Sequence, residues 1–250
     1  MIRIASFKEY FKGFEDQYVI IGGTACEILM SDNSLNFRAT KDIDLVLIIE
    51  TLTKEFCEIF WQYINDAGYE HISKATNKSE YYRFSNPKSP DYPKMIELFS
   101  KKQDWLLSSI KQNIIPIHID DEVSSLSAIL LDDTYYNFLT KGISKIHGIS
   151  ILKAEHIIPF KAKAWIDLTY RKEHGELIDS KDIKKHRNDI IRLSTLLSPN
   201  LNMTLPNKIK EDLSFFIQKL NEDEFNLKQM GINHISKEEL IQFLNQFYSL

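Results

Sequence analysis

Two aspartates separated by one residue are the strongest candidates for chemistry in this sequence. Asp42 and Asp44 open the apolar run DIDLVLII, which is short and predicts a strand. Alternate side chains of a strand leave on the same face, so the two carboxylates would lie about 6–7 Å apart. They repel each other unless a cation lies beside them, and Mg²⁺ takes carboxylate oxygens together with substrate phosphate oxygens. A turn at the strand's start is the alternative, but it explains Asp42 and not Asp44.

A pair of glycines precedes this motif in the run YVIIGGTACEILM. Gly22 and Gly23 follow a short apolar strand and lead into a helix, and Thr24 adds a hydroxyl at the start of that helix. Glycines let the backbone come close to a ligand, and a helix N-terminus favours phosphate. The alternative is a tight strand-to-helix turn that binds nothing.

A third acid lies in the run PKMIELFS. Glu97 is surrounded by apolar residues that predict another strand. If this strand pairs with the aspartate strand, three carboxylates meet, which suits a two-metal phosphoryl-transfer site. The alternative is an exposed residue on an alternating strand.

Two later helices carry charges on otherwise apolar faces. In PFKAKAWIDLTYRK, taken to begin near Pro159, Lys161 shares a stripe with Trp165 and therefore faces inward, where it needs an anionic partner such as a triphosphate. In DSKDIKKHRNDIIRL, Asp182 and Asp189 lie on one face with Lys185 and His186 between them. A salt-bridge network between the two helices explains these charges equally well.

The elements that must hold these residues are strands first and helices later, which predicts an α+β fold. Strands are expected at 18–21, 43–49, 81–85, 95–99 and 114–119, with a short last strand at 149–152. Helices are expected at 24–30, 54–65, 124–139, 159–171, 180–197, 208–220 and 237–248. The chain would thus divide into a sheet-containing part, 1–150, and a helical part, 151–250.

Composition excludes several classes of protein. The 250 residues are 43% hydrophobic and 26% charged with a net charge of −4, which is globular and not a general nucleic-acid coat. Residues 153–192 carry a small basic excess, which either receives a phosphate-bearing ligand or is a solvated helix face. No apolar run could cross a bilayer, no signal peptide is recognisable, and two cysteines form no disulfide framework, so we expect a cytoplasmic protein. Phosphate-loop, dinucleotide-binding, nucleophile-elbow and HExxH motifs are absent from the sequence.

The order of these motifs resembles a known family. A glycine pair, then Asp-x-Asp on a second strand and an acid on a later strand, is similar to the nucleotidyltransferase superfamily typified by DNA polymerase beta. The string GGTA…RATKDIDL resembles the bacterial abortive-infection nucleotidyltransferases of the AbiEii/AbiGii toxin group. The matching residues are Gly22, Gly23, Thr24, Ala25, Arg38, Thr40, Asp42 and Asp44. Lys161 to Ala164 and Lys181-Asp182 with Asp189 look like that group's helical motifs.

The resemblance implies a small mixed-sheet core, completed by the helical part, that transfers a nucleotide from a nucleoside triphosphate to an acceptor hydroxyl. It implies Mg²⁺, with Mn²⁺ as the alternative ion, held by Asp42, Asp44 and Glu97. Gly22, Gly23, Thr24, Arg38 and Thr40 would bind the nucleotide, and Lys161 and Asp182 would assist.

In the characterised toxins of this group the acceptor is the tRNA 3′ end, and the resemblance also implies a toxin–antitoxin role with a cognate antitoxin protein. Two alternatives stay open. One is the same reaction on a small molecule or protein. The other is a nucleotide-binding module of this fold without turnover.

Overall fold

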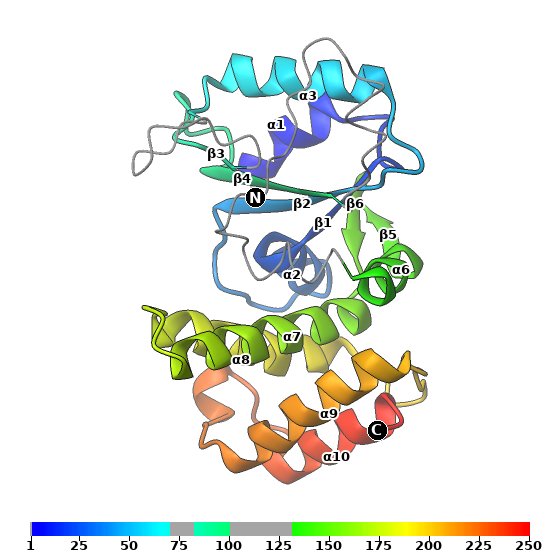
Figure 1. Ribbon diagram of the computed structural model, residues 1–250, viewed down its shortest axis with the longest axis vertical. Helices are drawn as coiled ribbons and strands as arrows, with labels where there is room; N and C mark the ends of the chain where they lie inside the picture. Colours follow the sequence, from blue (N-terminus) through cyan, green and yellow to red (C-terminus); the bar gives the residue numbers. More distant parts are fainter. Residues whose placement is uncertain (1, 71–82, 101–131) are drawn as a thin grey trace. The chain divides into compact units, whose positions relative to one another are not determined.

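The computed structural model describes residues 2–70, 83–100 and 132–250 (Figure 1). The chain forms two compact units. The sheet unit comprises Met1–Ile28, Arg38–Leu131 and Ile143–Leu152. The helical unit comprises Leu29–Phe37, Asp132–Gly142 and Lys153–Leu250.

The sequence led us to expect a division at residue 150. Instead, each unit combines several separate segments of the chain. The segment Asp132–Gly142 contains the helix Asp133–Lys141, which packs on later helices of the helical unit. Residues 143–152 then return as a hairpin that extends the sheet. Sequence patterns read one segment at a time could not show this interleaving, because it depends on which distant elements each segment pairs with.

The sheet contains six strands within the described residues, in the order β3-β4-β2-β1-β6-β5. The strands are β1 (Tyr18–Ile21), β2 (Asp42–Leu47), β3 (Arg83–Ser85), β4 (Met95–Ser100), β5 (Ile143–Ile146) and β6 (Ile149–Leu152). β2 pairs with β4 and β1 pairs with β6 in parallel, whereas the other neighbours are antiparallel. The predicted α+β class with a mixed sheet is confirmed. β5 was not predicted; it is tied to β6 by a two-residue turn in which His147 and Gly148 both have positive φ, as such hairpins require.

Helices cover both faces of this sheet (Figure 1). α1 (Ile2–Tyr10) and α3 (Lys54–Ala67) lie on one face, and α2 (Gly22–Asp32) starts on the other. Aromatic rings fill the first face: Tyr18 of β1 lies 5.3 Å from Phe7 and 6.3 Å from Phe56 between ring centroids. Tyr18 pairs with Leu47, so Leu47, Leu45 and Ile43 point to that face and are buried. Asp42 and Asp44 consequently point to the face of α2.

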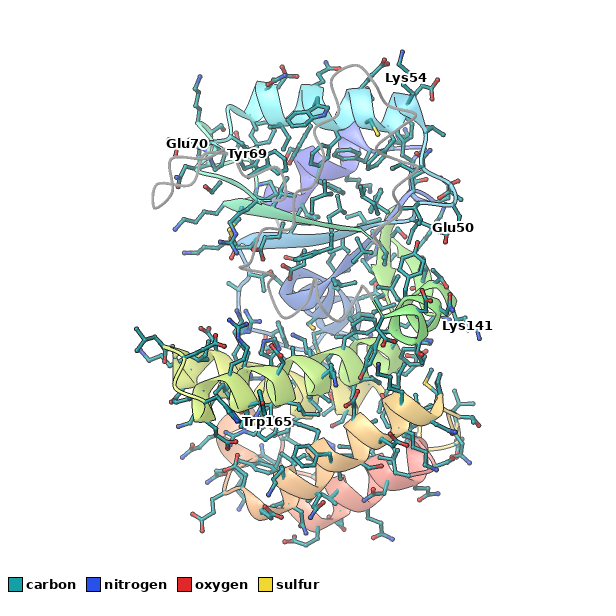
Figure 2. The ribbon with its side chains drawn as sticks, in the orientation of Figure 1. Glu50, Lys54, Tyr69, Glu70, Lys141 and Trp165 are labelled. Atoms are coloured by element: carbon teal, nitrogen blue, oxygen red, sulfur yellow. The ribbon has the colours of Figure 1, made fainter. Side chains whose placement is uncertain are left out.

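The helical unit is built from α6 (Asp133–Lys141), α7 (Ala154–Glu173), α8 (Ser180–Leu193), α9 (Asn207–Glu222) and α10 (Lys237–Phe247). Short 3₁₀ turns occupy Ser194–Leu196 and Lys228–Met230. Apolar stripes of these helices meet in its core, where Trp165 of α7 packs edge-on against Phe216 of α9 at 5.3 Å (Figure 2). Side-chain caps begin several helices, among them a capping box at Ser236 and Glu239 that starts α10.

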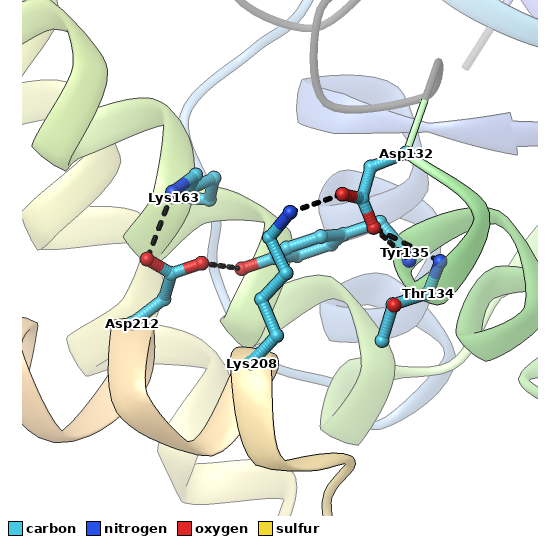
Figure 3. A network of polar contacts seen from close by, with 6 residues as sticks. All are labelled: Asp132, Thr134, Tyr135, Lys163, Lys208 and Asp212. Atoms are coloured by element: carbon cyan, nitrogen blue, oxygen red, sulfur yellow. Dashed lines mark hydrogen bonds and ion pairs between the residues drawn. The ribbon is translucent and has the colours of Figure 1, made fainter.

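Polar contacts tie α6 to α7 and α9 inside this unit (Figure 3). Asp212 Oδ2 accepts a hydrogen bond from the hydroxyl of Tyr135 at 2.9 Å, and Asp212 Oδ1 forms an ion pair with Lys163 Nζ at 2.8 Å. Asp132 caps α6 and also pairs with Lys208. Burial alone would raise the pKa of the Asp132 carboxyl, but the bonds from Lys208 and from the α6 amides outweigh it and lower that pKa.

The long helix α7 begins earlier than the sequence predicted. We placed Pro159 in the first turn, but it is the sixth residue of a helix that starts at Ala154. Proline has no N–H to give to the carbonyl of Glu155, four residues before it. The hydroxyl of the buried Tyr248 donates to that carbonyl instead, at 2.9 Å. A residue near the far end of the chain therefore supports the internal proline.

Other boundaries follow the sequence within a few residues, and α1 is a helix that was not predicted. The expected strand at 114–119, part of the expected helix at 124–139 and the first residues of the expected strand at 81–85 lie outside the described residues. α6 starts at Asp133, where the side chain of Asp132 accepts from two amides, and extends to Lys141. No helix in the described part of the chain is both long enough and apolar enough to span a membrane.

Candidate functional site

The register of β2 and β4 brings two acidic residues side by side. Asp44 lies directly opposite Glu97 across the parallel pair, and Asp42 lies opposite Met95. Directly opposite residues project from the same face of a sheet, so both aspartates and Glu97 share the face on which α2 begins. All three side chains are half-buried. The strand pairing therefore produces the acidic face that the sequence motifs suggested.

The turn at Gly22 and Gly23, which we call the glycine bend, contacts this acidic face. β1 ends at Ile21, which pairs with Asp44, and Gly22 follows with a φ of +67°. A Cβ atom on Gly22 would lie 1.7 Å from Asp44 Oδ2 and 2.7 Å from Asp44 Cγ. No side chain fits in that space, so the backbone can meet the carboxylate only because residue 22 is glycine.

The second glycine is in contact with the Arg-x-Thr segment that precedes β2. A Cβ on Gly23 would lie 2.9 Å from Thr40 Cγ2 and 3.1 Å from Arg38 Nη2. The guanidinium of Arg38 thus lies against the backbone of the bend. Arg38, Thr40 and the two glycines, which the sequence grouped only by resemblance, are neighbours in the sheet unit.

Hydroxyl groups bind this segment to α2. Thr24 Oγ1 donates to the backbone carbonyl of Asp42 at 2.5 Å and lies 3.1 Å from Thr40 Oγ1. The backbone N–H of Thr40 donates to Glu27 Oε2 at 2.9 Å, and its hydroxyl donates to the same oxygen. The proton of the Thr24 hydroxyl, which we had expected to contact phosphate, is therefore directed at the start of β2.

Glu97 has a cationic partner that the sequence analysis missed. Arg83 of β3 lies opposite Glu97, and its Nε and Nη2 lie 2.8 and 2.7 Å from Glu97 Oε1. The Glu97 side chain is 17% exposed, so this ion pair is only partly screened by water. The sequence predicted the strand that contains Arg83. Only the pairing of β3 with β4, and its register, identify Arg83 as the partner of Glu97.

Two carboxylates of the acidic face, those of Asp42 and Asp44, are suited to bind a divalent cation. Among the described residues, no three His, Cys, Asp or Glu side chains form a group that could hold a metal ion by themselves. Mg²⁺ is commonly held by one or two carboxylates while substrate phosphates supply further oxygens. Asp42 and Asp44, on one face beside the glycine bend, match that donor set, whereas Glu97 is engaged by Arg83.

Lys161 and Asp182 belong to the helical unit. Lys161 faces inward as expected, but its partner is a carboxylate: Lys161 Nζ lies 2.8 Å from Asp189 Oδ2, and the two side chains are 6% and 1% exposed. This is the salt bridge between helices that the sequence left as the alternative to a ligand. Asp182 is exposed in the first turn of α8.

Comparisons with known proteins do not identify a family for this chain. No protein-family model matches the sequence, and no curated protein matches it. Among solved structures, the chain is similar to the solution structure of the antibiotic-resistance factor ANT(2″)-Ia, with 13% sequence identity and a TM-score of 0.38. The alignment covers 91% of this chain and 94% of that chain. A similarity at this level says nothing about activity, so the function must be argued from the site residues.

Proposed function

We propose that this chain is a Mg²⁺-dependent nucleotidyltransferase that transfers a nucleotide from a nucleoside triphosphate to an acceptor hydroxyl. The observation that supports this most strongly is the contact between the bend and the acid, where a Cβ on Gly22 would lie 1.7 Å from Asp44 Oδ2. A backbone turn suited to phosphate and a carboxylate suited to a cation lie against each other there. Mg²⁺ in nucleotide sites is shared between such carboxylates and the substrate phosphates.

Each group in the sheet unit has a proposed task. Asp42 and Asp44 would hold Mg²⁺, which when bound neutralises negative charge on the triphosphate. The backbone of Gly22 and Gly23 would approach the phosphates, because it has no side chain to keep them away. The guanidinium of Arg38, 3.1 Å from a Cβ position on Gly23, would add positive charge at the same place.

The proposed reaction forms one bond and breaks one. The oxygen of the acceptor hydroxyl bonds to the α-phosphorus, the bond from that phosphorus to the oxygen bridging to the β-phosphorus breaks, and pyrophosphate leaves with the bonding electrons. The hydroxyl proton goes to a carboxylate, for which we propose Glu97. Glu97 lies directly opposite Asp44 on the same face of the sheet, and this position is the reason for proposing it as the proton acceptor.

Glu97 would instead be a metal ligand, as the sequence suggested, if its ion pair with Arg83 opened when substrate binds. The proposal that Lys161 and Asp182 assist the transfer rests on the resemblance alone; within the helical unit, Lys161 is paired with Asp189.

We further propose the tRNA 3′ end as acceptor and a toxin-like role opposed by an antitoxin protein. The support for both is the match of GGTA and RATKDIDL to the abortive-infection group. A small molecule or a protein hydroxyl is the rival acceptor. Incubation with each labelled nucleoside triphosphate and Mg²⁺, with total tRNA, with the protein alone and with a panel of small alcohols, separates these acceptors.

Asp44→Asn tests the catalytic assignment. It keeps the size of the side chain but removes its charge, so we expect transfer to fall by at least about 10³-fold. Asp16→Asn, at an exposed aspartate of the same unit, is the matched control and should transfer at the wild-type rate. Full transfer by pure Asp44→Asn would overturn the assignment. Wild-type protein that binds Mg²⁺ and triphosphate in calorimetry but never releases pyrophosphate would instead identify a binding module.

A further inference from the structure

A glutamate to which the sequence analysis gave no role contacts the candidate site. Glu27 lies on α2, one turn after Thr24, and a single carboxylate oxygen, Oε2, accepts both the backbone N–H and the hydroxyl of Thr40. Hydrogen bonds to an ionised acceptor are roughly twice as strong as those between neutral groups. One side chain of α2 therefore fixes both the backbone and the side chain of a residue in an irregular segment.

That segment carries the groups assigned to the nucleotide. Arg38 lies two residues before Thr40, and Asp42 lies two residues after it. The methyl group of Thr40 and the guanidinium of Arg38 both lie against Gly23, and the Asp42 carbonyl accepts from Thr24. Residues 35–41 form no helix or strand. Backbone hydrogen bonds hold the two ends of this segment, from Leu35 N–H to Met30 O and from Lys94 N–H to Lys41 O, and the side-chain contacts with α2 hold Thr40 between them.

We propose that Glu27 is a positioning residue for nucleotide transfer, acting through Thr40 to hold Arg38 over the glycine bend and Asp42 at the start of β2. This rests on the proposed function of the same site. Glu27 itself touches no substrate in this account. Its loss would release the Arg-x-Thr segment, and displacement of a binding group by about 1 Å can reduce a rate by about 10²-fold.

The experiment compares three variants of the full chain. Glu27→Ala removes the acceptor, and we expect kcat/KM for the triphosphate to fall by about 10²-fold, with part of the loss in KM because Arg38 is displaced. Glu27→Gln keeps an amide oxygen that can accept both bonds from Thr40, and should recover to within about tenfold of wild type. Glu58→Ala, at an exposed glutamate of α3, is the control and should match wild type.

A readout without turnover decides between positioning and mere stability. Hydrogen exchange of the amides in 38–42, at a temperature where all variants are folded, should accelerate in Glu27→Ala and stay near wild type in Glu27→Gln. Unchanged exchange, or wild-type kcat/KM in Glu27→Ala, would overturn the inference.

Failure of the proposed function has a different signature. In that case the wild-type chain itself would neither transfer nucleotide nor bind a non-hydrolysable triphosphate with Mg²⁺, whatever the exchange of 38–42 shows. A wild-type chain that binds and transfers, with Glu27→Ala indistinguishable from it, would refute the role of Glu27 alone.

Discussion

Replacing Gly22 by alanine tests whether the glycine bend and Asp44 form one site. Two separate costs follow from the structure. The residue has a φ of +67°, which costs an L-residue roughly 1–2 kcal/mol. The new Cβ would also lie 1.7 Å from Asp44 Oδ2, about half of a normal carbon–oxygen contact, so the carboxylate must rotate away or the bend must shift.

The second cost can be isolated with a matched control. Gly13 has a φ of +92°, and no atom lies within 4 Å of the position that a Cβ would take there, so Gly13→Ala has only the conformational cost. An off-rotamer Asp44 adds about 0.5–1.5 kcal/mol. We therefore expect Gly22→Ala to lower the free energy of unfolding by about 1.5–3.5 kcal/mol and Gly13→Ala by about 1–2 kcal/mol.

Activity should separate the two variants further. Displacement of the Asp44 carboxylate by about 1 Å should reduce nucleotide transfer by about 10²-fold in Gly22→Ala, with wild-type transfer in Gly13→Ala. The double variant Gly22→Ala/Asp44→Ala removes the clashing oxygens, so it should be more stable than the sum of the two single changes predicts. Urea unfolding and a labelled-nucleotide assay measure these quantities. Equal stability of the two glycine variants, additive effects in the double variant, or wild-type transfer by Gly22→Ala would refute the reasoning.

Three further predictions concern the helical unit. Tyr248→Phe should lower the free energy of unfolding by about 1–3 kcal/mol, because it leaves the carbonyl of Glu155 without the hydroxyl that replaces the missing proline N–H; urea unfolding with Tyr170→Phe as an exposed control checks this. Lys161→Met should cost about 3–5 kcal/mol by leaving Asp189 buried without its cation, and a thermal melt indistinguishable from wild type would contradict it. The lowered pKa of Asp132 contributes stability that is present above the pKa of the unfolded chain, about 3.9, and is lost as pH falls through the folded value. Asp132→Asn should therefore flatten the acid side of a stability–pH curve, and an unchanged curve would count against that contribution.

The Lys161 prediction also bears on how activity data are interpreted. A variant at Lys161 that loses transfer could do so because the helical unit loses its buried ion pair with Asp189. Transfer should therefore be measured well below the unfolding midpoint of each variant. Asp44→Asn leaves the Lys161–Asp189 pair of the helical unit intact, so it tests the chemistry more directly.

Local sequence patterns determined much of this protein. The apolar run after Asp42 and the alternation of its side chains predicted β2 and the shared face of the two aspartates, because a strand's period of two follows from backbone geometry. Apolar spacing likewise predicted α3, α8, α9 and α10 within a few residues, and the inward direction of Lys161.

Only the tertiary structure decided which groups meet. The parallel register of β2 and β4 puts Glu97 opposite Asp44, and the neighbouring β3 gives Glu97 an arginine partner, Arg83. Lys161 pairs with Asp189 of α8. The carbonyl of Glu155, which Pro159 leaves without an N–H donor, accepts a hydrogen bond from the hydroxyl of Tyr248. A residue type and its spacing limit what a side chain can do. Its partner, however, is chosen by packing between segments far apart in the chain, whose energies no local pattern encodes.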